Sequence, residues 1–208
     1  IIIPVYNEIN SLPVILKKIF DDTPKIKKKI IIVDDFSNDG TREWLIKKRK
    51  KSNINIILKK KNEGKGSAVI EGIKYTKSND IILIQDADLE YDPADYDKLL
   101  EPFFKTNAEV VYGSRFRGGG YARLHFFWHS LANKLLTLAS NLVTNLNMTD
   151  METGYKLFKS SVIKSIDLKE NSFGIEPEIT VKLSRKNYIF YEVPISYSGR
   201  SYSDGKKI

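Results

Sequence analysis

The chain has 208 residues, of which 41% are hydrophobic and 29% are charged, and it contains no cysteine. This composition is typical of a globular protein and excludes a disordered chain, a collagen and a coiled coil. The lack of cysteine excludes a disulfide framework, a thiolate nucleophile and a zinc site built on cysteine. Because His125 and His129 are the only histidines, metal chemistry based on imidazole is nearly excluded as well.

The sequence shows no targeting segment and no membrane span. The most apolar stretch, residues 124–143, is interrupted by two histidines, an asparagine and a lysine. A spanning helix needs about 20 predominantly apolar residues without such interruptions. The chain starts at Ile1 rather than at methionine, so we expect it to begin inside a strand of a longer parent protein.

The net charge of +8 is unevenly distributed along the chain. Basic residues outnumber acidic ones from residue 17 to 61, whereas acidic residues prevail from 62 to 120. The lysine runs are typical of solvated helix ends and loops, and they equally suit attraction to an anionic membrane or nucleotide. Nucleic acid is disfavoured as a partner, because the runs lack interleaved arginine and aromatic side chains.

In the first half of the chain, short β-branched runs alternate with amphipathic segments. The predicted buried strands are residues 1–5, 29–33, 54–58, 81–85 and 109–113. The predicted helices are residues 11–20, 41–51, 67–76 and 95–104. This alternation predicts an α/β fold with a mostly parallel sheet and helices on both of its faces. Ligands of such a fold bind at the carboxyl ends of the strands.

After residue 113 the pattern changes. Glycines at 118–120 predict a flexible loop, and an apolar stripe at helical spacing predicts one long helix over 123–144. The first turns of this helix, 124–128, are apolar nearly all round. They are interpreted as helix core, and contact with an acyl chain or membrane interface is left open as the alternative. A strand near 155–158, a helix near 175–186 and a strand at 188–193 complete the predicted elements.

Carboxylates follow three of the predicted strands at their carboxyl ends. They are Glu8 after the first strand, Asp34 and Asp35 after the second, and Asp86, Asp88 and Glu90 after the fourth. Like charges crowded into one cleft repel, so this arrangement favours a bound cation. Oxygen ligands without histidine or cysteine favour Mg²⁺ or Mn²⁺, and an ion held by one or two carboxylates leaves positions for substrate phosphates.

The third predicted strand leads into a segment with two glycines, residues 62–68. Glycines at the start of a helix let backbone N–H groups approach a phosphate or a ribose. The segment is not a dinucleotide-binding fingerprint, because Val69 stands at its third glycine position, and it lacks the Walker spacing. An EF-hand is excluded because Tyr91 stands where its loop needs glycine.

Four motifs follow one another in the first half of the chain: PVYNE at 4–8, VDDFS at 33–37, NEGKG at 62–66 and DAD at 86–88. In this order and spacing they resemble inverting family 2 glycosyltransferases of the GT-A (nucleotide-diphospho-sugar transferase) fold. Later motifs are similar to the branch that transfers mannose or glucose to dolichyl or other polyprenyl phosphates. These later motifs are GSRF at 113–116, TDMETGYK at 149–156, EPE at 176–178, EVPI at 192–195 and the end of the chain, 197–208.

The resemblance covers nearly the whole chain and implies one catalytic domain, residues 1–208. Its nucleotide-sugar-binding half would be 1–113, and its acceptor-side half with a C-terminal tail would be 114–208. The resemblance implies that Pro4, Tyr6, Glu8, Asp35, Lys65, Asp86 and Ala87 bind the nucleotide sugar. It implies that Asp86, Asp88 and Glu90 hold the metal, although many relatives carry glutamine or a similar ligand at the position of Glu90.

The resemblance also implies which residues act on the reaction. Asp88, Arg115 and Arg200 would be catalytic, the arginines by gripping phosphate. Ser114, Arg115, Arg123 and Arg200 would contact the acceptor. A metal and arginines would neutralise the leaving diphosphate, and a phosphate acceptor, already ionised near pH 7, would need no general base. The two histidines are interpreted as a surface pair, and Glu176 and Glu178 suit either helix-start charges or a role in the site.

The expected activity is therefore metal-dependent hexosyl transfer with Mg²⁺ or Mn²⁺, from GDP-mannose or UDP-glucose to a polyprenyl phosphate. The expected location is the cytoplasm, peripherally at the cytosolic face of a membrane. There the lysine-rich blocks would meet the anionic surface, and residues 126–128 and 197–208 would touch lipid. No motif distinguishes mannose from glucose.

Three other functions remain open from the sequence. A glycosyltransferase acting on a saccharide hydroxyl needs a general base, for which Asp150 and Glu152 are the nearby candidates. A HAD-like phosphohydrolase also places Asp-x-Asp after a strand, but it normally begins with that motif and carries Thr or Val where Glu90 stands. A non-catalytic docking module would retain the fold, and the intact Asp86 and Asp88 argue against it.

Overall fold

The computed structural model describes residues 1–48, 53–118 and 127–199. In this part of the chain the first sheet has the order β1-β2-β3, with all strands parallel. Its strands are β1 (Ile2–Val5), β2 (Ile30–Asp34) and β3 (Ile54–Leu58). They consist almost entirely of β-branched and aliphatic residues, as expected for parallel strands that are covered on both faces.

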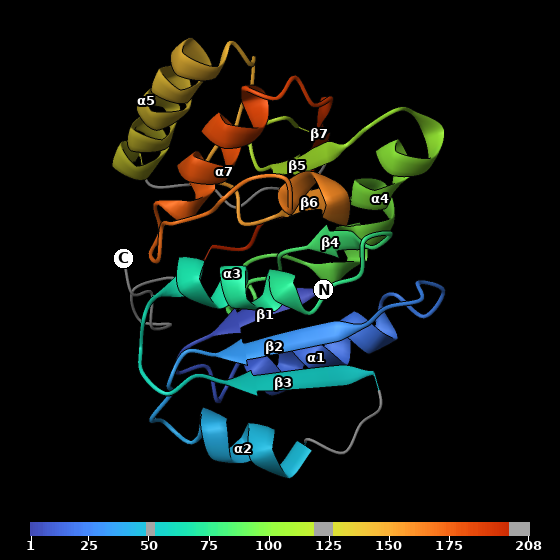
Figure 1. The fold of residues 1–208 in the computed structure, drawn as a ribbon, viewed down its shortest axis with the longest axis vertical. Helices are drawn as coiled ribbons and strands as arrows, with labels where there is room; N and C mark the ends of the chain where they lie inside the picture. The colour runs from blue at the N-terminus through green and yellow to red at the C-terminus, as the bar shows by residue number, and fades with distance from the viewer. Residues whose placement is uncertain (49–52, 119–126, 200–208) are drawn as a thin grey trace.

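The second sheet has the order β4-β6-β5-β7 and mixes the two strand directions. Its strands are β4 (Ile81–Leu83), β5 (Val110–Ser114), β6 (Lys156–Lys159) and β7 (Phe190–Pro194). Strand β6 runs antiparallel to β4 and β5, whereas β5 and β7 are parallel. A parallel bridge between Ile2 and Ile84 connects the two sheets, so β1 and β4 lie side by side (Figure 1).

Helices cover both faces of the first sheet, as the sequence predicts (Figure 1). The helices of the first half are α1 (Leu12–Asp21), α2 (Thr41–Lys48), α3 (Lys65–Lys74) and α4 (Tyr96–Lys105), the last preceded by a 3-10 turn, η1 (Pro93–Asp95). Those of the second half are α5 (Phe127–Thr144), α6 (Ser160–Ile163) and α7 (Ile175–Ser184). The last residues of the predicted helix 41–51 fall on 49–52, and the first residues of the predicted long helix 123–144 fall on 119–126. Both segments lie outside the described residues.

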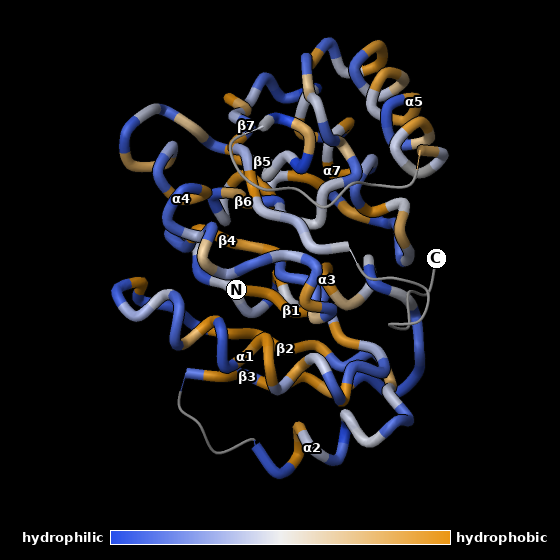
Figure 2. Tube along the Cα trace, turned by 180° about the vertical axis from the view of Figure 1, so that it is seen from behind, coloured by the Kyte–Doolittle hydropathy of each residue, from blue (hydrophilic) through white to orange (hydrophobic). Residues whose placement is uncertain are grey.

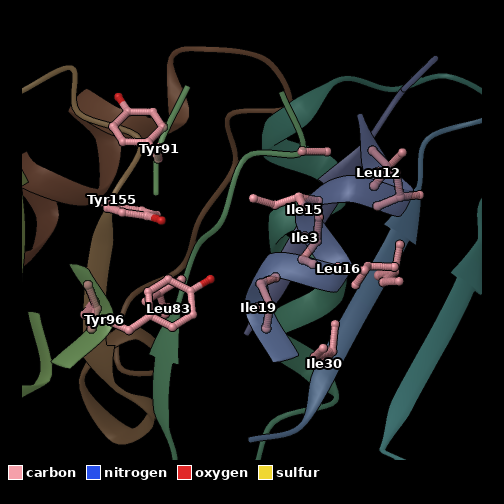
Figure 3. Packing of buried hydrophobic residues seen from close by; sticks show 14 of the residues in the cluster. Ile3, Leu12, Ile15, Leu16, Ile19, Ile30, Leu83, Tyr91, Tyr96 and Tyr155 are labelled. Carbon is pink, nitrogen blue, oxygen red and sulfur yellow. The ribbon is translucent and has the colours of Figure 1, made fainter. Parts of the chain in front are cut away.

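Two hydrophobic cores lie on opposite faces of the sheets. On one face, Ile15 and Ile19 of α1 pack with Ile3 and Ile30, and the same core continues to Tyr155 under the second sheet (Figure 3). The other core lies on the far side of the two sheets, where α3 and α7 pack against them. Strands β1 and β2 are hydrophobic over most of their length in Figure 2 and are buried at every residue, whereas β3 is fully buried only at Ile56.

Helix α5 corrects one prediction, because Trp128 at its apolar start is exposed instead of forming helix core, and so is the apolar stripe that follows. Trp128, Leu135, Leu138 and Leu142 are between 56% and 78% exposed. Polar side chains occupy the inward side of the helix. Their hydrogen bonds are Asn133 Nδ2 to Asp150 (3.3 Å), Thr137 Oγ1 from Met151 N (3.2 Å) and Asn141 Nδ2 to Met148 O (2.8 Å). The stripe faces outward because these polar contacts, rather than leucine packing, attach α5 to the 148–151 segment.

Candidate active site

A pocket of about 580 Å³ opens at the carboxyl ends of β1, β2 and β4, where the sequence predicts ligand binding. The predicted residues that line it are Pro4, Tyr6, Glu8, Asp35, Lys65, Asp86, Ala87, Asp88 and Glu90. Val5, Asn62, Gly64, Ala68, Ser172 and Phe173 complete the lining. The structure therefore brings together all the predicted nucleotide-sugar residues and all the predicted metal ligands. The segment before α7 adds a wall that sequence reasoning missed.

The carboxylate of Asp86 lies directly against the backbone of Gly154. A Cβ atom at position 154 would overlap Asp86 Oδ2, and it would lie 2.9 Å from the Tyr91 ring. The Gly154 N–H donates to Tyr91 Oη over 2.8 Å. A side chain at 154 would therefore push the Asp86 carboxylate or the Tyr91 ring aside, so the turn of the second half helps to position the acid of the first half.

Lys65 neutralises part of the charge of Asp86. Its Nζ lies 2.8 Å from Asp86 Oδ1 and 2.9 Å from Glu176 Oε1. Lys65 is the first residue of α3 and Glu176 lies in the first turn of α7, so these helices meet at the edge of the pocket. The expected contact of Lys65 with the nucleotide sugar is thus accompanied by an ion-pair bridge between the two halves of the domain.

Asp35 organises the glycine loop that precedes α3. Its carboxylate accepts hydrogen bonds from the backbone N–H groups of Glu63 (3.1 Å) and Gly64 (2.6 Å). The Lys59 ammonium lies 2.6 Å from the same carboxylate. Gly64 has a φ of +98°, and a Cβ there would overlap the Asn171 carbonyl, so only glycine fits between this loop and the 170–172 segment. Asp35 thereby shapes the pocket wall.

Asp88 and Glu90 follow Asp86 in the same turn. The Glu90 N–H donates to Asp88 Oδ1 (3.1 Å), and Tyr197 Oη donates to Glu90 Oε2 (2.7 Å). Among the described residues, no three acidic or histidine side chains form a group arranged to hold a metal ion. The expected trio of Asp86, Asp88 and Glu90 is therefore not preassembled. Two carboxylates facing an open pocket still suit Mg²⁺ or Mn²⁺, which take their remaining ligands from phosphate and water.

Comparison with known proteins identifies the family. A family model described as "Glycosyl transferase family 2" matches residues 1–167. This chain belongs to glycosyl transferase family 2. It is 29% identical to the undecaprenyl-phosphate mannosyltransferase of Micrococcus luteus, over 99% of this chain and 85% of that protein. It is 28% identical to the dolichol-phosphate mannosyltransferase of Pyrococcus furiosus, over 99% of this chain but only 58% of the length of that protein.

Solved structures confirm the GT-A fold. Glucosyl-3-phosphoglycerate synthase from Mycobacterium tuberculosis, in complex with Mn²⁺, UDP and phosphoglyceric acid, matches with a TM-score of 0.74 at 15% identity. The match covers 98% of this chain and 71% of that one. At this identity the likeness establishes the fold, and with the family match it confirms that the chain is a glycosyltransferase.

Arg115 of the glycosyltransferase is held by a buried acid. Its Nε and Nη2 each donate to Asp150 over 2.7 Å, and its guanidinium stacks 5.2 Å from the centre of the Tyr197 ring. Asp150 is fully buried, and its N–H donates to Glu192 over 3.1 Å. Asp150 is therefore committed to Arg115 and is a poor general base, whereas Glu152 is half-buried, and burial raises its pKa.

The predicted acceptor contacts fare differently. Ser114 is buried at the end of β5, and its hydroxyl lies 2.6 Å from that of Thr149; its contact with an acceptor stays a prediction. Arg115 does not line the pocket formed by the described residues, although it lies beside Tyr197. Arg123 and Arg200 lie outside the described residues, as do most of the 197–208 tail and Phe126.

Sequence reasoning left a role in the site open for Glu176 and gave none to Gly154. Both residues stand inside motifs that the sequence singles out, but their contacts with Lys65 and Asp86 depend on how the two halves of the chain pack. Lys59 had no signal beyond its place in a lysine run. Phe173 is 56% exposed at the pocket, and an exposed aromatic side chain before a helix cannot be distinguished by sequence from an ordinary surface residue.

Lys156 fastens the turn that carries Gly154. It is fully buried, and its ammonium donates to the carbonyls of Met151 (2.8 Å) and Thr153 and lies 4.8 Å from the centre of the Tyr112 ring. Burial lowers the pKa of Lys156 to about 8, because the charged form is poorly solvated there.

We expect Gly154→Ala to weaken metal-dependent donor binding by about tenfold or more, because the added Cβ displaces the Asp86 carboxylate. Calorimetry with Mn²⁺ and the donor nucleotide measures the effect. Gly174→Ala is the matched control, since its Cβ meets only the mobile end of Glu170, at 3.1 Å. Donor binding by a folded Gly154→Ala protein at the wild-type level would contradict this role.

The lowered pKa of Lys156 leads us to expect that the free energy of unfolding rises with pH. Between pH 8 and 10.5 the folded protein has lost the Lys156 proton while the unfolded chain retains it, so unfolding takes up a proton and its free energy increases with pH. From pH 7.5 to 10, the unfolding free energy of the wild type relative to Lys156→Met should rise by about 2 kcal/mol. Urea denaturation measures this difference, and Lys159→Met, a half-buried lysine on the same strand, supplies the reference slope. A difference independent of pH would exclude a lowered pKa for Lys156.

Proposed function

We propose that this glycosyltransferase moves a hexose, mannose or glucose, from a nucleotide diphosphate sugar to a polyprenyl phosphate with the help of Mg²⁺ or Mn²⁺. The observation that carries the proposal is a pocket in which Asp86, Asp88 and Lys65 meet the glycine loop organised by Asp35. The similarity to undecaprenyl-phosphate and dolichol-phosphate mannosyltransferases supports the class of acceptor.

The donor would lie with its nucleoside toward β1 and β2 and its diphosphate toward Asp88. Tyr6 is 39% exposed at the pocket and offers an aromatic face, while the glycine loop offers close backbone approach. A divalent ion held by Asp86 and Asp88 would neutralise the diphosphate as it leaves. Asp86 is kept in position for this by Gly154 on one side and by Lys65 on another.

The acceptor side of the proposal rests on charge. A phosphate monoester is ionised near pH 7, so its oxygen attacks without a general base. This agrees with the commitment of Asp150 to Arg115. A saccharide acceptor is the second candidate, and the observation that favours it is the raised pKa of the half-buried Glu152, a property that suits a base operating near neutral pH.

A lipid acceptor requires the enzyme to reach a membrane surface. No described helix is long and apolar enough to cross a bilayer. The outward face of α5 instead has the character of an interfacial helix: Phe127, Trp128, Leu135, Leu138, Leu142 and Val143 are all more than half exposed. Helix α5 lies at the outer edge of the molecule beside α7, on the acceptor-side half (Figure 1). We infer that α5 rests on the cytosolic membrane face, with the protein peripherally bound.

The donor site is tested by calorimetry with GDP-mannose and UDP-glucose in the presence of Mn²⁺ or Mg²⁺. One donor should bind in a metal-dependent manner, and Asp88→Ala should weaken that binding by at least about tenfold, because a ligand of the ion is lost. Asp97→Ala removes an exposed acid on α4 and is the matched control. If neither donor binds with either metal, the proposed transfer is wrong.

The membrane contact is tested by sedimentation with anionic phospholipid vesicles. Phe127→Ser combined with Trp128→Ser should lower the partition coefficient by at least about tenfold, because two large apolar side chains no longer enter the interface. Phe104→Ser on α4 is the matched control, since Phe104 is 76% exposed and Trp128 is 74% exposed. Equal partitioning of the double variant and the control would contradict a lipid-facing α5.

A further inference from the structure

A chain of three charged side chains runs from the pocket into the protein. Lys65 Nζ contacts both oxygens of Asp86, at 2.8 and 3.1 Å, and Oε1 of Glu176 at 2.9 Å. The side chains of Lys65 and Asp86 are each 18% exposed and that of Glu176 is 9% exposed. The interaction is therefore weakly screened by solvent, and a change in one charge is felt by the others.

Glu176 is unusual because one of its two carboxylate oxygens is buried without a hydrogen-bond partner among the described residues. That oxygen is Oε2, while Oε1 is used by Lys65. Burying an ionised carboxylate with an unsatisfied oxygen is costly unless a nearby positive charge compensates. The placement of Glu176 suggests a role through Lys65.

We propose that Glu176 is a positioning residue that controls how strongly the donor site binds its divalent cation. The inference rests on the metal-dependent transfer proposed above. One ammonium shared between two carboxylates leaves this trio one negative charge in excess. The buried ammonium of Lys156 also acts on Glu176, but the charge of Glu176 still offsets that of Lys65 and so preserves the attraction of Asp86 for a cation. With Glu176 neutral, Lys65 and Asp86 form a one-to-one pair without net charge, and the ammonium competes with the incoming metal ion for the same oxygens.

Substitutions can distinguish an effect of the Glu176 charge on cation binding from a role of Glu176 in stabilising helix α7. Glu176→Gln preserves the shape of the side chain and removes its charge, so Mn²⁺ binding in the presence of the donor nucleotide should weaken on the order of tenfold. Lys65→Met combined with Glu176→Gln removes the competing ammonium as well. Because Lys65 is also expected to contact the nucleotide, this variant is compared without nucleotide, where its Mn²⁺ affinity should return to within about twofold of the wild type. Glu71→Gln, which neutralises an acid in an ion pair with Lys74 on the same helix as Lys65, is the matched control for net charge.

Mn²⁺ binding is measured by calorimetry and by the loss of the free Mn²⁺ resonance signal. GDP or UDP is present for the single variants, and nucleotide is left out for the double variant and its wild-type reference. Transfer assays supply a second readout: Glu176→Gln should raise the Mn²⁺ concentration for half-maximal rate and leave the rate at saturating Mn²⁺ close to the wild type. Support of the fold alone would lower the stability of the variant without moving the metal dependence.

Two results would overturn the inference while leaving the proposed function intact: wild-type Mn²⁺ affinity in Glu176→Gln, or failure of the double variant to recover affinity. If the wild type itself takes up no Mn²⁺ with either nucleotide, the metal-dependent function fails first, and the inference fails with it. Thermal unfolding of each variant confirms that affinities are compared between folded proteins.

Discussion

The position of the Asp86 carboxylate is the constraint on which the rest of the site depends. It lies at the seam between the two sheets, just past the Ile2–Ile84 bridge, and is confined by the Gly154 backbone and the Lys65 ammonium. Each contact comes from a different part of the chain. The Asp86 carboxylate therefore takes its position in the pocket only when the first and second halves of the chain have packed together.

The neighbouring residue, Gln85, shows how this seam is kept rigid. Its Oε1 accepts hydrogen bonds from Tyr96 Oη and Tyr155 Oη, each over 2.7 Å, inside the core. Figure 3 shows the rings of Tyr91, Tyr96 and Tyr155 gathered beside Leu83 of β4. Buried polar groups whose hydrogen bonds are all formed favour one arrangement. This tyrosine cluster therefore fixes Gln85 at the end of β4, while the backbone of Gly154 confines the next residue, Asp86.

Much of the first half was predictable because its signals are local. Buried β-branched runs bounded by turn residues located β1, β2 and β3, and the acids that follow them line one pocket because parallel strands end on the same edge. The direction of β6 and the outward face of α5 were not predictable, since both depend on which partner the element meets. An apolar stripe indicates a helix face that avoids water, but it does not say whether protein or lipid covers that face.

The same distinction applies to the site. Asp88 and Lys65 stand in recognisable motifs, and they line the pocket as expected. Arg115 stands in a motif too, yet its Asp150 partner and its position beside Tyr197 depend on contacts far apart in sequence. The pairing of Glu176 with Lys65 is of this second kind. Motifs thus locate side chains that line the pocket, whereas packing determines the charges that surround them.

Transfer of a hexose to a lipid phosphate is measured most directly by a transfer assay. Radiolabelled GDP-mannose or UDP-glucose is incubated with the enzyme, Mn²⁺ and vesicles containing undecaprenyl phosphate, and the lipid phase is extracted and counted. A metal-dependent glycolipid is expected, and it should be absent with Asp88→Ala. Label that enters a saccharide acceptor and never the lipid phase would contradict transfer to a lipid phosphate.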